Sequence, residues 1–106
     1  YRQVLESLEQ LVGHSISRIH IVGGGSRNAL LNQFVADATG RRVIAGPAEA
    51  TAAGNILVQA MGAGAVKSID QARAIIGASF PVEEFLPGAD RKGWESAYER
   101  FQSLTP

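Results

Sequence analysis

A run of glycines between a predicted strand and a predicted helix is the part of this chain best suited to chemistry. Residues 19–28 read Ile-His-Ile-Val-Gly-Gly-Gly-Ser-Arg-Asn, and residues 29–37 continue with apolar side chains at helical spacing. Backbone N–H groups at a helix start carry a partial positive charge, and glycine lets an anion or a purine ring approach the backbone without meeting a Cβ atom. The segment therefore predicts a site for phosphate or a nucleotide.

Two common nucleotide motifs do not fit this glycine run. A dinucleotide-binding fingerprint needs glycine at its first, third and sixth places, but the sixth residue counted from Gly23 is Asn28. The next predicted strand also ends without an acidic residue for a ribose. A P-loop needs Lys followed by Ser or Thr, and neither Lys67 nor Lys92 lies near the run. Three glycines alone are a weak signal, so the kind of nucleotide site must be inferred from the flanking residues.

Helices and short strands are predicted to alternate around the glycines. Apolar spacing predicts a first helix over 4–12 that ends near Gly13, and a β-branched run predicts a strand over 18–22. The helix after the glycines should end at Gly40 as its C-cap, and a second strand should cover 42–45. A strand, a helix and another strand form a right-handed crossover, so the two strands should be parallel. The expected fold class is α/β, with short parallel strands covered by helices.

The second half of the chain is predicted to be mainly helical. Residues 48–65 are small or aliphatic with almost no charge, which predicts a helix buried on most of its circumference. Ser68 and Gln71 form a capping box that opens a short helix. Residues 80–88 are expected to be an ordered connection before a last helix over 94–104. The aromatic residues of that helix are expected in the core: Trp94, Tyr98 and Phe101.

Two strands make a narrow parallel sheet. Parallel sheets are normally wider and covered on both faces, and both edges of a two-stranded sheet would stay unpaired. The chain also begins at Tyr1, without an initiator Met. We therefore expect further strands from the remainder of a longer polypeptide, with self-association of this chain as the alternative source.

Composition narrows the class of protein. The chain has 106 residues, 45% of them hydrophobic and 19% charged, which fits one small globular domain. Ten Lys plus Arg balance ten Asp plus Glu without a basic stripe, so nucleic acid is not an expected partner. The absence of cysteine and of a long apolar run gives no sign of disulfides, export or a membrane partner. We expect a cytoplasmic location.

The remaining polar residues are expected to be structural. His14 and His20 have no metal-ligand spacing, so no metal site is expected. Gln33 and Asp37 fall on the polar side of the second predicted helix, where they should contact neighbouring structure or another domain. Asp37 is not expected to be a catalytic group.

With its flanks, the glycine run resembles a known family. The order of strand, Gly-Gly-Gly-Ser-Arg-Asn and helix is similar to the second nucleotide motif of the actin, hexokinase and Hsp70 superfamily of ATPases. Residues 23–28, 31–33, 36–41 and 45–55 resemble the C-terminal part of the FGGY carbohydrate kinases, and within them the branch that phosphorylates L-rhamnulose. The resemblance implies that residues 1–106 are a fragment of an actin-like ATPase (ribonuclease H-like) fold. They would form the C-terminal part of its second, nucleotide-binding domain, with the N-terminal domain absent.

The resemblance also assigns roles in the glycine turn, which we define as residues 23–28. Gly24 matches the family glycine whose backbone lies against ATP, and Asn28 matches the polar residue that reaches the nucleotide. Gly23 and Gly25 are expected to shape the turn. A side chain at Gly24 would project into the volume of the adenine or the phosphates, whereas the Asn28 amide offers both a donor and an acceptor.

Three further predictions concern the residues beside these. Ser26 is expected to be the N-cap of the following helix. Arg27 is expected either to contact phosphate or to be simply solvated. In the family motif over Glu49–Asn55, small residues favour close helix packing over ligand contact, and Glu49 suits the positive end of a helix dipole.

The resemblance implies an ATP-binding portion of a kinase that transfers the γ-phosphate of ATP, with Mg²⁺, to a sugar hydroxyl. The expected ketose is L-rhamnulose, giving L-rhamnulose 1-phosphate, and xylulose, fuculose and glycerol kinases are the competing assignments. No acidic residue matches the aspartate base of the family, so no catalytic residue is expected here. Without the N-terminal kinase domain the chain alone is expected to be inactive. The alternative is a non-catalytic packing or oligomerisation module in which the glycines only connect two elements.

Overall fold

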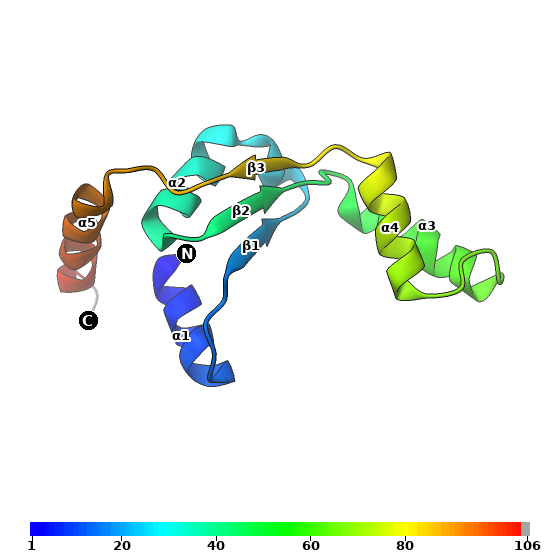
Figure 1. Ribbon diagram of the computed structural model, residues 1–106, viewed down its shortest axis with the longest axis horizontal. Coiled ribbons are helices and arrows are strands. Elements are labelled where there is room, and N and C mark those ends of the chain that lie inside the picture. Colours follow the sequence, from blue (N-terminus) through cyan, green and yellow to red (C-terminus); the bar gives the residue numbers. More distant parts are fainter. Residues whose placement is uncertain (105–106) are drawn as a thin grey trace.

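A computed structural model describes residues 1–104 of the chain, which fold around a three-stranded sheet (Figure 1). The molecule is elongated, with extents of 53 × 28 × 21 Å. The elements in chain order are α1 (Arg2–Val12), β1 (Arg18–Ile21), the 3₁₀ helix η1 (Gly24–Arg27), α2 (Ala29–Thr39), β2 (Arg42–Ala45), α3 (Ala50–Gly62), α4 (Ile69–Ser79), β3 (Glu83–Phe85) and α5 (Arg91–Leu104).

The sheet contains the predicted parallel pair and one further strand. β1 pairs with β2 in parallel, with Arg18 opposite Arg42, and β3 pairs with the other side of β2 in the antiparallel sense, with Val43 opposite Phe85. The predicted α/β fold class and the parallel pairing are confirmed. β3 lies inside the predicted connection over 80–88, and its pairing makes the prediction of two unpaired edges wrong for β2. Within residues 1–104, β1 still pairs on one side only.

Helix α2 covers one face of this sheet. Buried residues of α2, β2 and β3 form the core: Val35, Ala36, Val43, Ala45 and Phe85. Three partly buried residues pack against this core: Ile19, Ile21 and Leu31. The opposite face carries the exposed side chains of Arg18, His20, Arg42 and Glu84. On that face the Arg42 Nη2 atom donates to Glu84 Oε2 at 3.0 Å.

Three of the predicted helix ends agree with the structure. Gly13 and Gly40 are the C-caps of α1 and α2, with φ values of 76° and 65° that favour glycine. At the start of α4, Ser68 Oγ accepts from the Gln71 main-chain N–H at 3.1 Å. The Gln71 side chain accepts in turn from the Lys67 N–H at 2.7 Å. These side chains therefore satisfy two N–H groups at or next to the helix start.

Helices α3 and α4 form a pair at one end of the molecule, away from the sheet (Figure 1). Ala53 is the one buried residue of α3, while Ile56 and Val58 are 67% and 66% exposed. The prediction that this helix is buried on most of its circumference is therefore wrong for this chain. The helix is apolar in composition, but among the described elements it packs mainly on α4.

The aromatic residues of α5 are also not core residues. Trp94 and Tyr98 are half-buried and Phe101 is 50% exposed. The Trp94 ring lies 5.5 Å from the Phe34 ring of α2, measured between centroids. Because α5 packs on α2 at the edge of the molecule and not under the sheet, its aromatic face is only partly covered.

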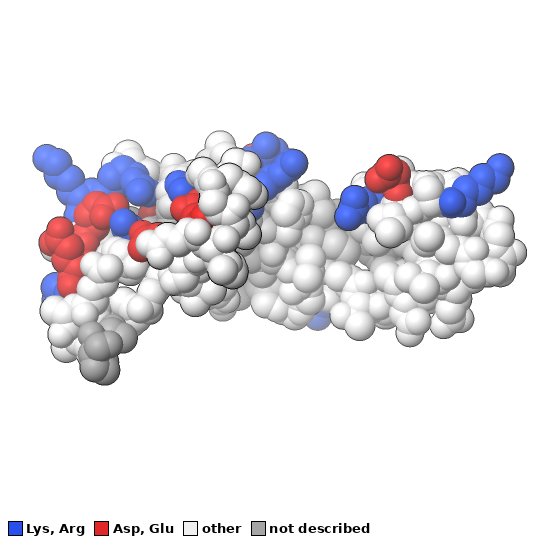
Figure 2. All heavy atoms as spheres, turned by 90° about the horizontal axis from the view of Figure 1, so that it is seen from below, with Lys and Arg blue, Asp and Glu red and all other residues white. Residues whose placement is uncertain are grey.

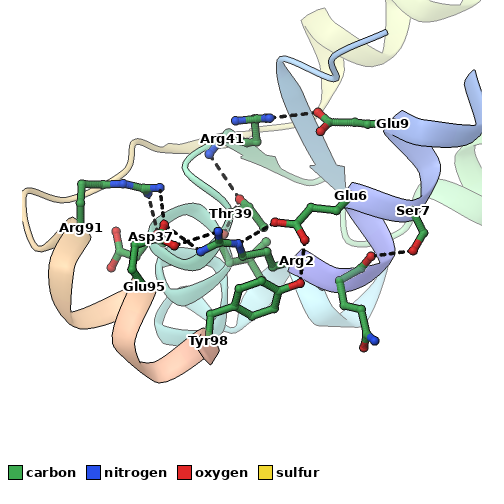
Figure 3. A network of polar contacts seen from close by, with 12 residues as sticks. Arg2, Glu6, Ser7, Glu9, Asp37, Thr39, Arg41, Arg91, Glu95 and Tyr98 are labelled. Atoms are coloured by element: carbon green, nitrogen blue, oxygen red, sulfur yellow. Dashed lines mark hydrogen bonds and ion pairs between the residues drawn. The ribbon is translucent and has the colours of Figure 1, made fainter. Parts of the chain in front are cut away.

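A polar network joins α1 to α5 (Figure 3). The Arg2 guanidinium donates to both carboxylate oxygens of Glu95, at 2.9 and 3.0 Å, and to Glu6 at 2.9 Å. Arg2 also lies 4.1 Å from the centroid of the Tyr98 ring, whose hydroxyl donates to Glu6 at 2.7 Å. Figure 2 shows charged side chains of both signs gathered at this end of the molecule. The network therefore fixes the two helices at the extremes of the chain to each other.

Candidate functional site

The glycine turn lies at the carboxyl end of β1, beside the loop that follows β2. The Gly23 N–H donates to the Pro47 carbonyl at 3.1 Å, and the Gly46 N–H donates to the Ile21 carbonyl at 2.8 Å. Two main-chain hydrogen bonds therefore hold the two loops together where the parallel strands end. In open α/β sheets this is the edge at which ligands bind.

The turn contains a short 3₁₀ helix before α2 begins. Gly23 has φ 76° and ψ −163°, a combination that is open to glycine and strained for other residues. Its carbonyl accepts both the N–H and the hydroxyl of Ser26, at 3.1 and 2.7 Å. The Asn28 N–H donates to the Gly25 carbonyl at 3.1 Å. Gly23 thus sets the shape of the turn through its backbone, while Gly25 has no positive φ.

Gly24 and Gly25 are exposed at the surface of this turn. A Cβ atom built on Gly24 would meet nothing within 4 Å. As the first residues of a helix, the two glycines have N–H groups without an intrahelical acceptor, and neither donates to another residue in 1–104. The turn therefore presents two free N–H groups beside open space.

Asn28 is the N-cap of α2. Its Oδ1 atom accepts from the Leu31 N–H at 3.0 Å. The prediction that Ser26 is this cap is wrong, because the 3₁₀ helix places one extra turn between the glycines and α2, and Ser26 bonds back to Gly23 inside it. Since the cap uses Oδ1, the Nδ2 amide of the exposed Asn28 is the group that is free to contact a ligand.

Arg27 pairs with Glu49 across the two loops. The Arg27 Nη2 atom lies 3.1 Å from Glu49 Oε1, and the side chains are 70% and 69% exposed. Glu49 stands at the N-cap position of α3, and its side chain makes no capping hydrogen bond. The guanidinium is therefore not simply solvated, but its one carboxylate partner is exposed and can be exchanged for another anion at little cost.

A cavity of about 470 Å³ borders the turn. Its walls come from the turn, the β2–α3 loop and the segment that enters β3: Ser26, Arg27, Ala45–Glu49 and Phe80–Glu83. A second cavity of about 340 Å³ lies between α1, α2 and α5 and is lined mainly by aliphatic and aromatic side chains. The first cavity meets the glycine turn at Ser26 and Arg27, whereas Gly24 and Gly25 do not line it.

Gln33 and Asp37 are structural, in agreement with the sequence prediction. Asp37 Oδ1 accepts from the Gly88 N–H at 2.7 Å and from Gln33 Nε2 at 2.8 Å. Gln33 Nε2 also donates to the Leu86 carbonyl at 2.8 Å. The pair thus anchors the linker between β3 and α5 on α2, away from the glycine turn.

Asn32 is a residue of this site that the sequence reasoning did not single out. Its side chain is fully buried, and its Nδ2 atom donates to the Ser26 carbonyl at 2.9 Å. The sequence does contain a signal for it: Asn32 is a polar residue three positions before the apolar Val35, on the same face of the predicted helix.

Residues 1–104 offer neither a metal-binding cluster nor a membrane-spanning helix. They contain no group of three or more His, Cys, Asp or Glu side chains placed to hold a metal ion. Among the same residues, every helix is too short or too polar to cross a membrane.

The arrangement is that of an α/β domain whose candidate site, an exposed glycine turn, lies where parallel strands end, a place typical of nucleotide-binding domains. The model of the FGGY family of carbohydrate kinases, C-terminal domain, matches residues 1–63. The chain belongs to this family, which confirms the resemblance found in its sequence.

Two curated relatives are rhamnulokinases. The protein from Bacteroides thetaiotaomicron is 47% identical over 103 residues, which cover 97% of this chain and 21% of the relative. The protein from Bacillus subtilis is 46% identical over 87 residues, which cover 82% of this chain and 18% of the relative. The chain therefore spans about a fifth of the length of these proteins.

Proposed function

We propose that this chain is the nucleotide-binding part of an ATP-dependent carbohydrate kinase that forms L-rhamnulose 1-phosphate from L-rhamnulose. The observation that carries the proposal is the exposed glycine turn, with two free N–H groups, in a chain of the FGGY kinase family. The choice of sugar follows the two relatives, which are rhamnulokinases. Xylulose, fuculose and glycerol kinases are the alternatives within the same family.

The residues of the turn fit ATP in complementary ways. At Gly24 the open space and the missing Cβ let a purine or phosphate lie against the backbone. The free N–H groups of Gly24 and Gly25 suit phosphate oxygens, and the Asn28 Nδ2 group suits an acceptor on the nucleotide. Gly23 holds the turn in shape through its backbone. Arg27 would exchange Glu49 for a phosphate group.

The described residues offer no cluster of acidic side chains for Mg²⁺. Phosphoryl transfer needs acidic oxygens for the metal and a carboxylate base for the sugar hydroxyl. Residues 1–104 contain no acidic cluster for a metal, and Glu49, the carboxylate at the turn, pairs with Arg27. We therefore assign the base, the Mg²⁺ ligands and the sugar contacts to other parts of a longer kinase that acts in the cytoplasm. Its N-terminal domain would face this chain, which forms part of the second actin-like domain.

The test uses a chimeric kinase, in which this chain replaces the matching 103 residues of the Bacteroides rhamnulokinase. The expected result is ATP-dependent phosphorylation of L-rhamnulose, with this chain supplying the nucleotide-binding part of the chimera. A folded chimera that binds L-rhamnulose but neither binds nor uses ATP would contradict the proposal.

A further inference from the structure

We propose that Asn32 is a positioning residue for the nucleotide, acting from the interior of the domain on the conformation of the glycine turn. The inference rests on the proposed function. Asn32 lies in the first half of α2, on the face turned toward the sheet, and is 0% exposed. It therefore cannot touch a nucleotide in the open space beside Gly24. Its effect on the site must pass through the residue that it contacts.

That residue is Ser26. The Asn32 Nδ2 group donates to the Ser26 carbonyl at 2.9 Å, and the Ser26 N–H and hydroxyl both bond to the Gly23 carbonyl. The Asn32 main-chain N–H also donates to the Asn28 carbonyl at 3.0 Å. One buried amide thus connects α2 to the middle of the 3₁₀ helix, where the free N–H groups of Gly24 and Gly25 are presented.

The burial of this amide is costly for the fold. The Asn32 Oδ1 atom is buried and has no hydrogen-bond partner within residues 1–104. A buried polar atom without a partner loses the hydrogen bonds that water gave it, so an apolar side chain of similar size would fit the same place without that loss. An asparagine is favoured here only if the bond from its Nδ2 group has another use. Holding the Ser26 carbonyl, and with it the direction of the neighbouring N–H groups, is the use that the geometry provides.

The test compares two variants in the chimeric kinase. Asn32→Leu removes both the donor and the unpartnered acceptor, and Asn32→Ala removes the same two groups with a shorter side chain. For both variants we expect the KM for ATP to rise about five- to tenfold. A change of this size corresponds to the loss of one neutral hydrogen bond that holds the turn in position. The KM for the sugar should stay within about twofold, an energy change well below that of one hydrogen bond.

Thr39→Val is the matched control. Thr39 is also a buried polar residue of α2, but it lies at the other end of the helix, where its hydroxyl donates to the Val35 carbonyl at 2.6 Å. This variant should lower thermal stability without changing the KM for ATP. An unchanged KM for ATP in both folded Asn32 variants would overturn the inference while leaving the proposed function intact. A wild-type chimera without ATP binding would instead contradict the proposed function.

A second measurement does not depend on the folding of any variant. In the 106-residue chain labelled with ¹⁵N-asparagine, the Asn32 side-chain NH₂ group should exchange its hydrogens with solvent far more slowly than that of the exposed Asn28. Equal exchange rates for the two groups would contradict the buried bond to Ser26 and overturn the inference.

Discussion

The main-chain N–H of Gly23 donates to the main-chain carbonyl of Pro47, and this 3.1 Å bond ties the glycine turn to the loop that leads into α3. The bond joins residues 23–28 and 45–55, two segments that are apart in the sequence and that both resemble the kinase family. It also explains why the candidate cavity is lined by both loops. Because the contact is made by backbone atoms, it depends on the conformation of Gly23 more than on any side chain.

Substitution at Gly23 should therefore affect folding. Gly23→Ala places a Cβ on a backbone with φ 76° and ψ −163°, which should lower the free energy of unfolding by about 1–3 kcal/mol. Gly24→Ala meets open space, so its effect on the free energy of unfolding should stay within about 0.5 kcal/mol. Urea unfolding of the 106-residue chain measures both. Equal losses at the two positions would contradict this account of the turn.

Substitution at Gly24 should instead affect the nucleotide. Gly24→Leu fills the open space beside the turn and should raise the KM for ATP of the chimeric kinase at least about tenfold, or about 1.4 kcal/mol of lost binding. The control is Gly77→Leu, because a Cβ at Gly77 in α4 also meets nothing within 4 Å. A change of similar size in the KM for ATP at both glycines would show that the effect is not local to the turn.

Asn28 combines two functions that substitution can separate. Asn28→Ala removes the cap of the Leu31 N–H and should lower the free energy of unfolding by about 1 kcal/mol. Asn28→Ser keeps a capping oxygen but loses the Nδ2 donor, so stability should be retained while the KM for ATP rises. If Asn28→Ser uses ATP as well as wild type, the Asn28 side chain has a structural role only.

How far the sequence predicted the fold depends on the length and pattern of each element. The parallel pair and the caps at Gly13 and Gly40 were predictable because β-branched runs and terminal glycines have local causes. β3 was missed because it has three residues, two of them glutamates, and exists only through pairing with β2. Apolar composition indicated that α3 is covered, but composition cannot tell a core from a surface that other parts of a longer protein cover.

The candidate site was predicted only in part, because some of its features have local causes and others depend on tertiary contacts. The exposed glycine turn follows from local backbone rules. The assignment of the α2 cap to Ser26 failed because an intervening 3₁₀ helix moves the cap to Asn28, and sequence spacing alone does not fix that extra turn. The contact of Asn32 with Ser26 is a tertiary contact of a buried polar group, and helical periodicity predicts its face but not its partner.

The stability of the chain should fall in acid because three carboxylates have stabilising partners. The Ile16 N–H, followed by Arg41, lowers the pKa of Glu9. Hydrogen bonds from Arg2 lower the pKa values of Glu6 and Glu95. Carboxylates with lowered folded-state pKa values stabilise the fold above their ordinary pKa, and this stabilisation is lost as the pH falls through the lowered values. The free energy of unfolding should therefore decrease below about pH 5.

Arg2→Met tests this explanation of the acid sensitivity. Without the guanidinium, Glu6 and Glu95 should titrate closer to their ordinary range, so the difference in unfolding free energy between pH 7 and pH 3.5 should become smaller (Figure 3). Glu9 does not contact Arg2, so part of the difference should remain. An unchanged pH dependence in this variant would contradict the assigned role of the network.

The most direct test of the central claim is a crystal structure of the chimeric kinase with a non-hydrolysable ATP analogue. We predict that the analogue lies against the backbone of Gly24, with its polar atoms within hydrogen-bond distance of the free N–H groups of the turn or of the Asn28 side chain. An analogue bound elsewhere, with the turn from Gly23 to Asn28 facing solvent or packed against protein, would contradict it.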